Sequence, residues 1–345
     1  MCRKLHSTIC ALLLMLITAG PAIAETTVRV SGFTWPSYGY WSVVEKQKLS
    51  DKIKIEFRPI EDPYDSMSLL AAGQLDVVLN TLEYAPIGAS EGRPISVVAY
   101  YAISQGADKI IVAPEIANPA DLAGKTVGVL EGGLPEIFMS MWLEKNGVDV
   151  AKVKKVNVIA DDVFAAMVGG SISAGVFWEP FATNVLGTVK GTRLVANSGD
   201  PEWLKTGVVA DAIYMNKDFV ARDRAAAEEF VRAYFAAIAW HKAHSAEGNA
   251  MIAEAMKMPE KDVASVLGSA GEKGSLYVYS FQDSARLCGA MAGDPPFGQA
   301  NGQIEEIWST IAAWWVKLGR LKEVPASAVD CGLVTSLVKT GFTGE

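Results

Sequence analysis

The chain has 345 residues, a formal net charge of −8, 50% hydrophobic residues and 20% charged residues. This balance can bury a sizeable core, so it excludes a mainly disordered chain. The surplus of negative charge argues against nucleic acid or an anionic membrane as a partner.

The first residues predict export. Arg3 and Lys4 precede an apolar run over residues 9–19, and a small-x-small cleavage pattern follows at residues 22–24. This is the layout of a cleavable secretory signal, and the run is shorter than the roughly 20 apolar residues of a membrane-spanning helix. We therefore expect residues 1–24 to be a signal peptide and the mature, periplasmic chain to begin at Glu25. Losing Arg3 and Lys4 takes the net charge from −8 to −10.

The mature chain begins with alternating strands and helices. Strands are predicted at 27–33, 52–57 and 75–79, with helices at 40–48 and 64–72 between them. The alternating apolar residues of the second strand and the mainly apolar third strand are typical of a half-buried and a buried strand. Short connections between such elements favour a doubly wound α/β lobe.

A second unit of the same kind follows. Strands are predicted at 125–130, 153–159 and 174–178, with helices at 134–146 and 161–168. The segment MSLLAAGQLDVVL at 67–79 parallels VFAAMVGGSISAGVF at 163–177, since each has an apolar helix end, a glycine and then a strand. The fold class predicted is α/β with two lobes, each a mostly parallel sheet flanked by helices.

The C-terminal third is predicted to be helical, at 217–244, 246–256, 260–267 and 304–318. The tryptophan stripe of the last helix is typical of core packing. Outside the signal, Cys288 and Cys331 remain, either as a disulfide or as two separate thiols. His241 and His244 share one helix without nearby carboxylate or cysteine partners, so we expect no metal site and no cofactor.

Several motifs occur in a characteristic order after the export signal. They are WPSYG at 35–39, AAGQLDVV at 71–78, DLAGKTVGV at 121–129, EKNGVD at 144–149 and WEPF at 178–181. In this order they resemble the nitrate/taurine-type periplasmic substrate-binding proteins of ABC importers. The segment EGGLPEIFMSMWLEKNG at 131–147 is more similar to the urea-carboxylase-associated branch of that group.

The resemblance implies a type II-like periplasmic binding protein with its ligand between two lobes. The chain is expected to cross between the lobes near Val112 and Thr206. One lobe would then comprise residues 25–112 and 207–345 with the C-terminal helices, and the other residues 113–206. The implied partners are a small molecule, an ABC permease and its ATPase, and the protein is expected to be a monomer with no nucleic acid partner and no direct membrane insertion.

Candidate ligand-binding residues follow from the predicted strand ends. In open α/β sheets, ligands bind beyond the carboxyl ends of the strands, where loops and helix N-termini meet. Apart from Asp211, which lies near the second crossing, the candidates follow the predicted strands. The full set is Trp35, Tyr38, Asn80, Thr81, Glu83, Glu131, Gly132, Gly133, Glu136, Trp178, Glu179 and Asp211.

The chemistry of these residues favours a nitrogen compound. The resemblance implies that anion binders of this family have a loop of glycine, serine and threonine at a helix N-terminus. The N–H groups and hydroxyls of that loop hold the oxyanion. Residues 131–136 read EGGLPE, with no hydroxyl, two carboxylates and a proline at the expected helix start. Carboxylates beside aromatic rings attract cations. We expect guanidine, a urea-like amide or an amine, with taurine or another sulfonate, nitrate or a pyrimidine precursor as alternatives.

Other interpretations remain open at this point. Glu131 and Glu136 can simply stabilise a helix N-terminus, the proline after Glu179 can simply end a strand, and Trp35 and Trp178 can be structural. A related group of enzymes makes the thiamine pyrimidine with an active-site histidine and a cysteine-rich segment. Here the histidines and cysteines lie far from the predicted cleft strands, so we expect no enzyme activity. A subunit that senses a ligand for a membrane receptor is a further alternative.

Overall fold

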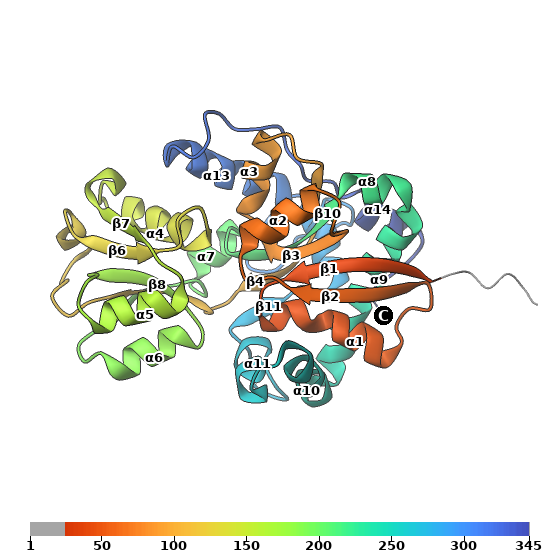
Figure 1. Cartoon of the computed structure of the whole chain (residues 1–345), viewed down its shortest axis with the longest axis horizontal. Helices are drawn as coiled ribbons and strands as arrows, with labels where there is room; N and C mark the ends of the chain where they lie inside the picture. The colour runs from red at the N-terminus through yellow and green to blue at the C-terminus, as the bar shows by residue number, and fades with distance from the viewer. Residues whose placement is uncertain (1–24, 345) are drawn as a thin grey trace, which may run out of the picture.

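The computed structural model describes residues 25–344, so the predicted signal at residues 1–24 lies outside the described part of the chain. Figure 1 shows two groups of strands side by side, each covered by helices. The α/β class and the flanking of two sheets by helices are therefore confirmed. No helix within residues 25–344 is long and apolar enough to cross a membrane.

The first sheet has six strands in the order β11-β4-β10-β3-β1-β2. The strands β1, β2 and β3 are parallel, whereas β10 runs antiparallel to β3 and β4, and β11 runs antiparallel to β4. Their bounds are β1 Thr26–Gly32, β2 Ile53–Pro59, β3 Val77–Thr81, β4 Ile95–Ser104, β10 Ala210–Asn216 and β11 Leu276–Val278.

The second sheet has five strands in the order β7-β6-β8-β5-β9 and repeats this plan. The strands β6, β7 and β8 are parallel, and β5 lies antiparallel to β8 and β9. Both sheets are therefore mixed and not mostly parallel as predicted, because each joins a parallel trio to strands in antiparallel pairs. The strands β4, β5, β9, β10 and β11 were not predicted from the sequence. The bounds are β5 Asp108–Val112, β6 Thr126–Val129, β7 Lys154–Asn157, β8 Ala174–Trp178 and β9 Arg193–Asn197.

The chain passes between the sheets twice. The first crossing lies at residues 105–107, between β4 and β5, and the second at 207–209, before β10. The first crossing therefore precedes the position expected near Val112, because β5 pairs with β8 and β9 of the second sheet. We call residues 25–104 and 210–344 the β1 lobe, and residues 108–206 the β6 lobe.

Helices cover both faces of the sheets. Those of the β6 lobe are α4 Leu134–Lys145, α5 Ala160–Val168, α6 Phe181–Thr188 and α7 Pro201–Thr206, with short 3-10 turns at η2 Pro119–Leu122 and η3 Val150–Lys152. Those of the β1 lobe before the first crossing are η1 Pro36–Gly39, α1 Tyr40–Gln47, α2 Pro63–Ala71 and α3 Tyr84–Ser90. After the second crossing come α8 Lys217–Arg222, α9 Arg224–Ala243, α10 Ser245–Met256, α11 Glu260–Leu267, α12 Phe281–Leu287, α13 Ile304–Lys317 and α14 Gly332–Lys339.

The single helix expected over residues 217–244 is divided into α8 and α9 at Asp223. The Asp223 carboxylate accepts a hydrogen bond from the backbone N–H of Ala226, 3.0 Å away, and so caps α9. A short acidic side chain can satisfy the free N–H groups of a new helix start, which is why the chain restarts there. The tryptophan stripe of α13 is core as predicted, since Trp308 and Trp315 are almost completely buried.

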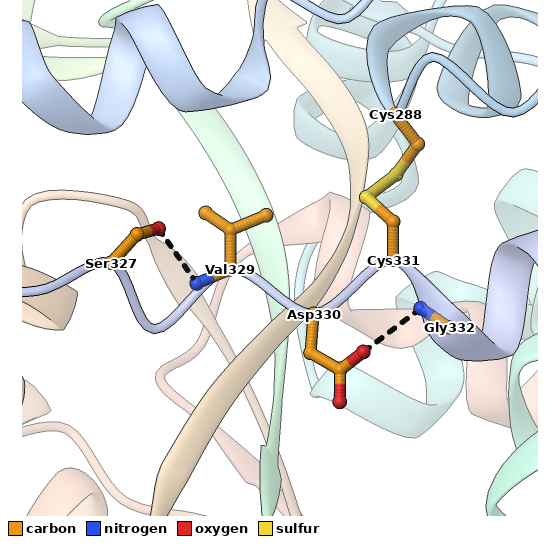
Figure 2. Close-up of a disulfide and its surroundings, with 6 residues drawn as sticks. All are labelled: Cys288, Ser327, Val329, Asp330, Cys331 and Gly332. Atoms are coloured by element: carbon orange, nitrogen blue, oxygen red, sulfur yellow. Dashed lines mark hydrogen bonds between the residues drawn. A yellow bond between two sulfur atoms is a disulfide. The ribbon is translucent and has the colours of Figure 1, made fainter.

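A disulfide between Cys288 and Cys331 joins two of the last helices (Figure 2). Cys288 follows α12, and Cys331 precedes α14, 43 residues later. Next to Cys331, the N–H of Asp330 donates to the carbonyl of Val97 in β4 at 2.8 Å. The disulfide thus fixes a segment that also pairs with a strand of the β1 lobe.

Candidate functional site

A cavity of about 530 Å³ lies where the carboxyl ends of the parallel strands of both sheets meet. The β1 lobe contributes the segments after β1, β2 and β3 and a residue of β11. The β6 lobe contributes the segments after β6, β7 and β8, and the two crossings supply the rest. The lining residues are Phe33, Thr34, Trp35, Glu61, Asp62, Pro63, Tyr64, Thr81, Glu83, Tyr84, Ser104, Asp108, Leu130, Leu134, Pro135, Ile159, Trp178, Phe181, Val209, Ala210, Asp211 and Leu276.

Five of the residues expected from strand ends line this cavity. They come from both lobes, although Trp35 and Trp178 are more than 140 positions apart in the sequence. The structure thus brings together Trp35, Thr81, Glu83, Trp178 and Asp211.

Tyr38 and Asn80 lie beneath the cavity wall instead of in it. Both are buried, and the ring of Tyr38 packs edge-on against Phe33 with centroids 4.8 Å apart. The Tyr38 hydroxyl donates to Asp211 at 3.3 Å, so it supports a lining residue from behind. The Asn80 side-chain oxygen accepts from the N–H of Thr81 at 2.9 Å and shapes the end of β3.

The loop at residues 131–136 turns its carboxylates away from the cavity. Glu136 is buried and accepts hydrogen bonds from Lys155 at 2.8 Å and from Arg320 at 2.7 Å. Burial opposes ionisation of Glu136, but the hydrogen bonds from Arg320, Gly132 and Lys155 outweigh it and lower its pKa. Glu131 also pairs with Arg320, at 3.0 Å. Glu131 and Glu136 are therefore paired with Lys155 and Arg320. The local sequence could not reveal this, because Arg320 comes from a distant segment.

Three further expected residues have structural contacts. Gly132 accepts a hydrogen bond at its carbonyl from the Tyr64 hydroxyl, 2.8 Å away, and this bond joins the two lobes. Gly133 is the N-cap of α4, and Leu134 is the first helical residue, one position before the proline. Glu179 forms an ion pair with Lys109 of β5, next to the cavity.

Glu83 has the most informative geometry in the cavity wall. One carboxylate oxygen, Oε1, accepts from the Thr81 hydroxyl at 2.8 Å and from the backbone N–H of Leu134 at 2.9 Å. The other oxygen, Oε2, is buried and has no hydrogen-bond partner within the described residues. The first N–H groups of a helix have no partner inside the helix and favour negative charge. The Glu83 carboxylate therefore occupies the N-terminus of α4 from the opposite lobe.

Two more acids lie in the same region of the wall. Asp211 accepts from the Ser37 hydroxyl at 2.7 Å, and Asp108 stands at the start of β5, directly after the first crossing. Burial raises the pKa of Glu83 and of Asp211 to about 7 and that of Asp108 to about 6. The charges of neighbouring acids add to this effect at each position, and hydrogen bonds from hydroxyl groups reduce it. We call Glu83, Asp108 and Asp211 the acidic cluster.

Asp108 and much of the aromatic wall, including Phe33, Tyr64 and Phe181, are not among the residues predicted from the sequence. Asp108 was missed because the antiparallel strands at the crossings were not assigned. The run SQGAD at 104–108 between two apolar segments could have marked a crossing.

Basic residues are missing from the cavity wall. Its lining within residues 25–344 contains no lysine, arginine, histidine or cysteine. In the same part of the chain, no group of three or more histidine, cysteine, aspartate or glutamate side chains could hold a metal ion. The wall consists of acids, hydroxyls and apolar or aromatic side chains.

Comparison with known protein families matches residues 50–247 to the family described as NMT1/THI5 like. This span is more than half of the chain. The chain belongs to the NMT1/THI5 like family. No curated protein matches the sequence at a significant level.

Solved structures with the same fold as this NMT1/THI5 like chain include two sulfonate-binding proteins. The periplasmic aliphatic sulphonate binding protein SsuA from Escherichia coli is 16% identical, with 88% of this chain and 90% of that chain covered and a TM-score of 0.67. The alkanesulfonate-binding protein SsuA from Xanthomonas axonopodis pv. citri, bound to MOPS, is 16% identical, with 89% and 99% covered and a TM-score of 0.66. The family and the fold confirm the resemblance to the nitrate/taurine-type group, whereas the closer similarity to the urea-carboxylase-associated branch stays a prediction.

An enzyme shares the fold as well. The desulfurization enzyme DSZB is 14% identical, with 92% of this chain and 100% of that chain covered and a TM-score of 0.60. At such identities the similarity establishes the fold alone, and function has to be derived from the residues of the site.

Proposed function

We propose that this chain is the periplasmic solute-binding component of an ABC import system. It captures a small nitrogen-containing compound, such as guanidine, an amine or a urea-like amide, between its lobes. The family, the fold and a cavity walled by both lobes support the binding role. The predicted export signal supports the location, and the permease and its ATPase are the partners such a component serves.

The ligand chemistry rests on one observation: the Glu83 carboxylate occupies the N-terminus of α4. A helix start is a ready site for an oxyanion, because its free N–H groups and its dipole favour negative charge. Here the N–H of Leu134 already donates to Glu83, 2.9 Å away. An incoming sulfonate or nitrate would meet this carboxylate and Asp211 without a basic side chain to compensate. A cation would instead be attracted by the carboxylates of Glu83 and Asp211.

The cavity supports binding instead of chemical conversion. His241 is buried and hydrogen-bonded to Asn249 at 2.8 Å, and neither residue lines the cavity. Cys288 and Cys331 are joined to each other. A histidine- and cysteine-dependent reaction like that of the thiamine-pyrimidine enzymes would therefore have neither group at this wall.

Capture requires only that the ligand stabilise the closed arrangement of the lobes. A solute that touches both walls binds the closed form better than the open form, and this difference shifts the equilibrium towards closure. Tyr64 of α2 and Gly132 already meet across the cleft. A permease would then recognise the closed shape.

Isothermal titration calorimetry of the mature chain with guanidinium, a simple alkylamine and taurine tests the ligand class. We expect heat from a cation and none from taurine. The Asp211→Asn variant should bind the cation more weakly, since it removes one charge of the acidic cluster. Tight taurine binding without a response to any cation would contradict the proposal.

Export and transport have separate readouts. We expect mass spectrometry of the periplasmic protein to give a chain beginning at Glu25. Deletion of the gene should abolish high-affinity uptake of the ligand found by calorimetry. Unchanged uptake with loss of a signalling response would instead assign the protein to sensing.

A further inference from the structure

The two walls of the cavity differ in chemistry. Apart from Asp108, the residues contributed by the β6 lobe are apolar: Leu130, Leu134, Pro135, Ile159, Trp178 and Phe181. The β1 lobe and the second crossing supply most of the polar groups, among them Thr81, Glu83 and Asp211. A ligand that fills the space thus faces acids on one side and a broad apolar surface on the other.

The volume of the cavity adds a constraint. About 530 Å³ lies within the range of roughly 300–1,000 Å³ for sites that hold drug-sized ligands. A bare guanidinium or methylammonium ion would leave most of this space to water against apolar side chains. Covering those side chains with an apolar group is favourable, because it removes apolar surface from water.

The acidic cluster has an unfilled bonding position. The buried Oε2 atom of Glu83 has no hydrogen-bond partner among the described residues. A buried polar atom without a partner is costly, and a charged N–H donor compensates for it better than a neutral one. Glu83 lines the cavity, so a ligand that brings a donor with positive charge to this wall offsets part of the cost of its buried carboxylate.

Building on the proposed function, we infer that the ligand is an organic monocation with two parts: an amine or amidine group at Glu83 and Asp211, and an apolar ring or chain against Trp178 and Phe181. The apolar body is as necessary as the charge. Guanidinium and the smallest amines are then weak members of the ligand class. A neutral molecule with the same shape as the cation should bind weakly.

Four probes separate charge from the apolar body. Benzamidinium has both parts, guanidinium only the charge, benzamide nearly the same shape without the charge, and benzenesulfonate the ring with the opposite charge. Phenethylammonium extends the set with a longer, more flexible cation. Calorimetry at pH 8 should give a dissociation constant for benzamidinium or phenethylammonium at least about tenfold below those of guanidinium and benzamide. Benzenesulfonate should not bind.

Two variants assign each part to its wall. Glu83→Gln should reduce the preference for benzamidinium over benzamide at least about tenfold, since only Asp211 then remains at the cationic group. Trp178→Ala should reduce the preference for benzamidinium over guanidinium by a similar factor. Each preference is a ratio measured on one preparation, so a partly unfolded variant does not distort it. Glu131→Gln, which changes an acid outside the cavity, should retain both ratios.

The outcomes distinguish the two proposals. If guanidinium binds as tightly as benzamidinium, or Trp178→Ala leaves their ratio unchanged, the need for an apolar body is refuted while the cation-binding function stands. If guanidinium binds at millimolar concentration but neither benzamidinium nor phenethylammonium does, the apolar body is likewise refuted and the cation-binding function stands. If benzenesulfonate binds more tightly than every cation, both proposals fail.

Discussion

The Glu83 carboxylate, just beyond strand β3 of the β1 lobe, accepts a hydrogen bond from the N–H of Leu134 at the start of α4 in the β6 lobe, 2.9 Å away. One acidic side chain thereby joins the lobes and fills the position at which an oxyanion would bind. The backbone carbonyl of Glu83 also accepts from the indole N–H of Trp315 at 2.7 Å, so α13 fixes the same residue from behind. Loss of the Glu83 charge should therefore affect ligand choice, pH dependence and stability together.

Cation binding should weaken as the pH falls. The pKa of Glu83 and of Asp211 is about 7 without ligand, and that of Asp108 is about 6, so a cation must displace protons from these groups near pH 6–7. If one proton is displaced, the dissociation constant should rise by up to about tenfold per pH unit below this range. Calorimetry in two buffers of different ionisation enthalpy measures the protons released. A constant affinity from pH 5 to 8 would show that the acidic cluster does not contact the cation.

The Glu83→Gln variant should be more stable than the wild type without ligand at pH 8. The pKa of Glu83 is raised to about 7 by burial, so the folded state holds the proton more strongly than the unfolded state. Wild-type stability then decreases as the pH rises from about 4.5 to 7, and by pH 8 ionisation costs about 3 kcal/mol that glutamine does not incur. Urea unfolding at pH 4.5 and pH 8 checks this expectation. A stabilisation equal at both pH values would disprove the assigned cause.

Gly132→Ala should hold the cleft open. A Cβ atom at Gly132 would lie 2.0 Å from the Tyr64 hydroxyl, and the residue has a φ of +78°. Either the Tyr64 side chain or its whole lobe has to move away from Gly132, and both movements break the hydrogen bond that joins the lobes there. We expect the open form to be favoured, with a larger radius of gyration in X-ray scattering and at least about tenfold weaker ligand binding. Gly124→Ala is the matched control, because its φ is +76° and no atom lies within 4 Å of the added Cβ. If both variants behave alike, backbone strain and not the interlobe clash is responsible.

Removing the disulfide should lower stability without changing the ligand affinity. Cys288 and Cys331 enclose a 43-residue loop, for which loop-closure entropy predicts a loss of about 4 kcal/mol when both become serine. Neither cysteine lines the cavity. Urea unfolding of the double variant, with the reduced wild type as a control, measures the loss. An unchanged unfolding midpoint would mean that the contacts of the C-terminal segment with β4 are sufficient.

Part of the cavity wall followed from local sequence. The alternation of strands and helices gave the strand ends, and ligands in α/β sheets bind beyond them. Trp35, Thr81, Glu83 and Trp178 were predicted on that basis and line the cavity, as does Asp211 near the second crossing. These positions depend on hydrophobic periodicity and turn residues, which act over a few neighbouring residues and are visible in one sequence.

Only the tertiary structure decided which acids face the cavity. Glu136 is turned away by Arg320, 184 positions later in the chain, and by Lys155 from β7. Asp108 lies in the wall because β5 pairs with strands of the second sheet. The turn residues at 104–108 indicate a break between strands, but not the sheet that the next strand joins. Sequence patterning determines whether a residue is at a strand end, but the partner of a charged side chain is set by segments that meet only after the chain has folded. The charge of the cavity is therefore a property of the tertiary structure.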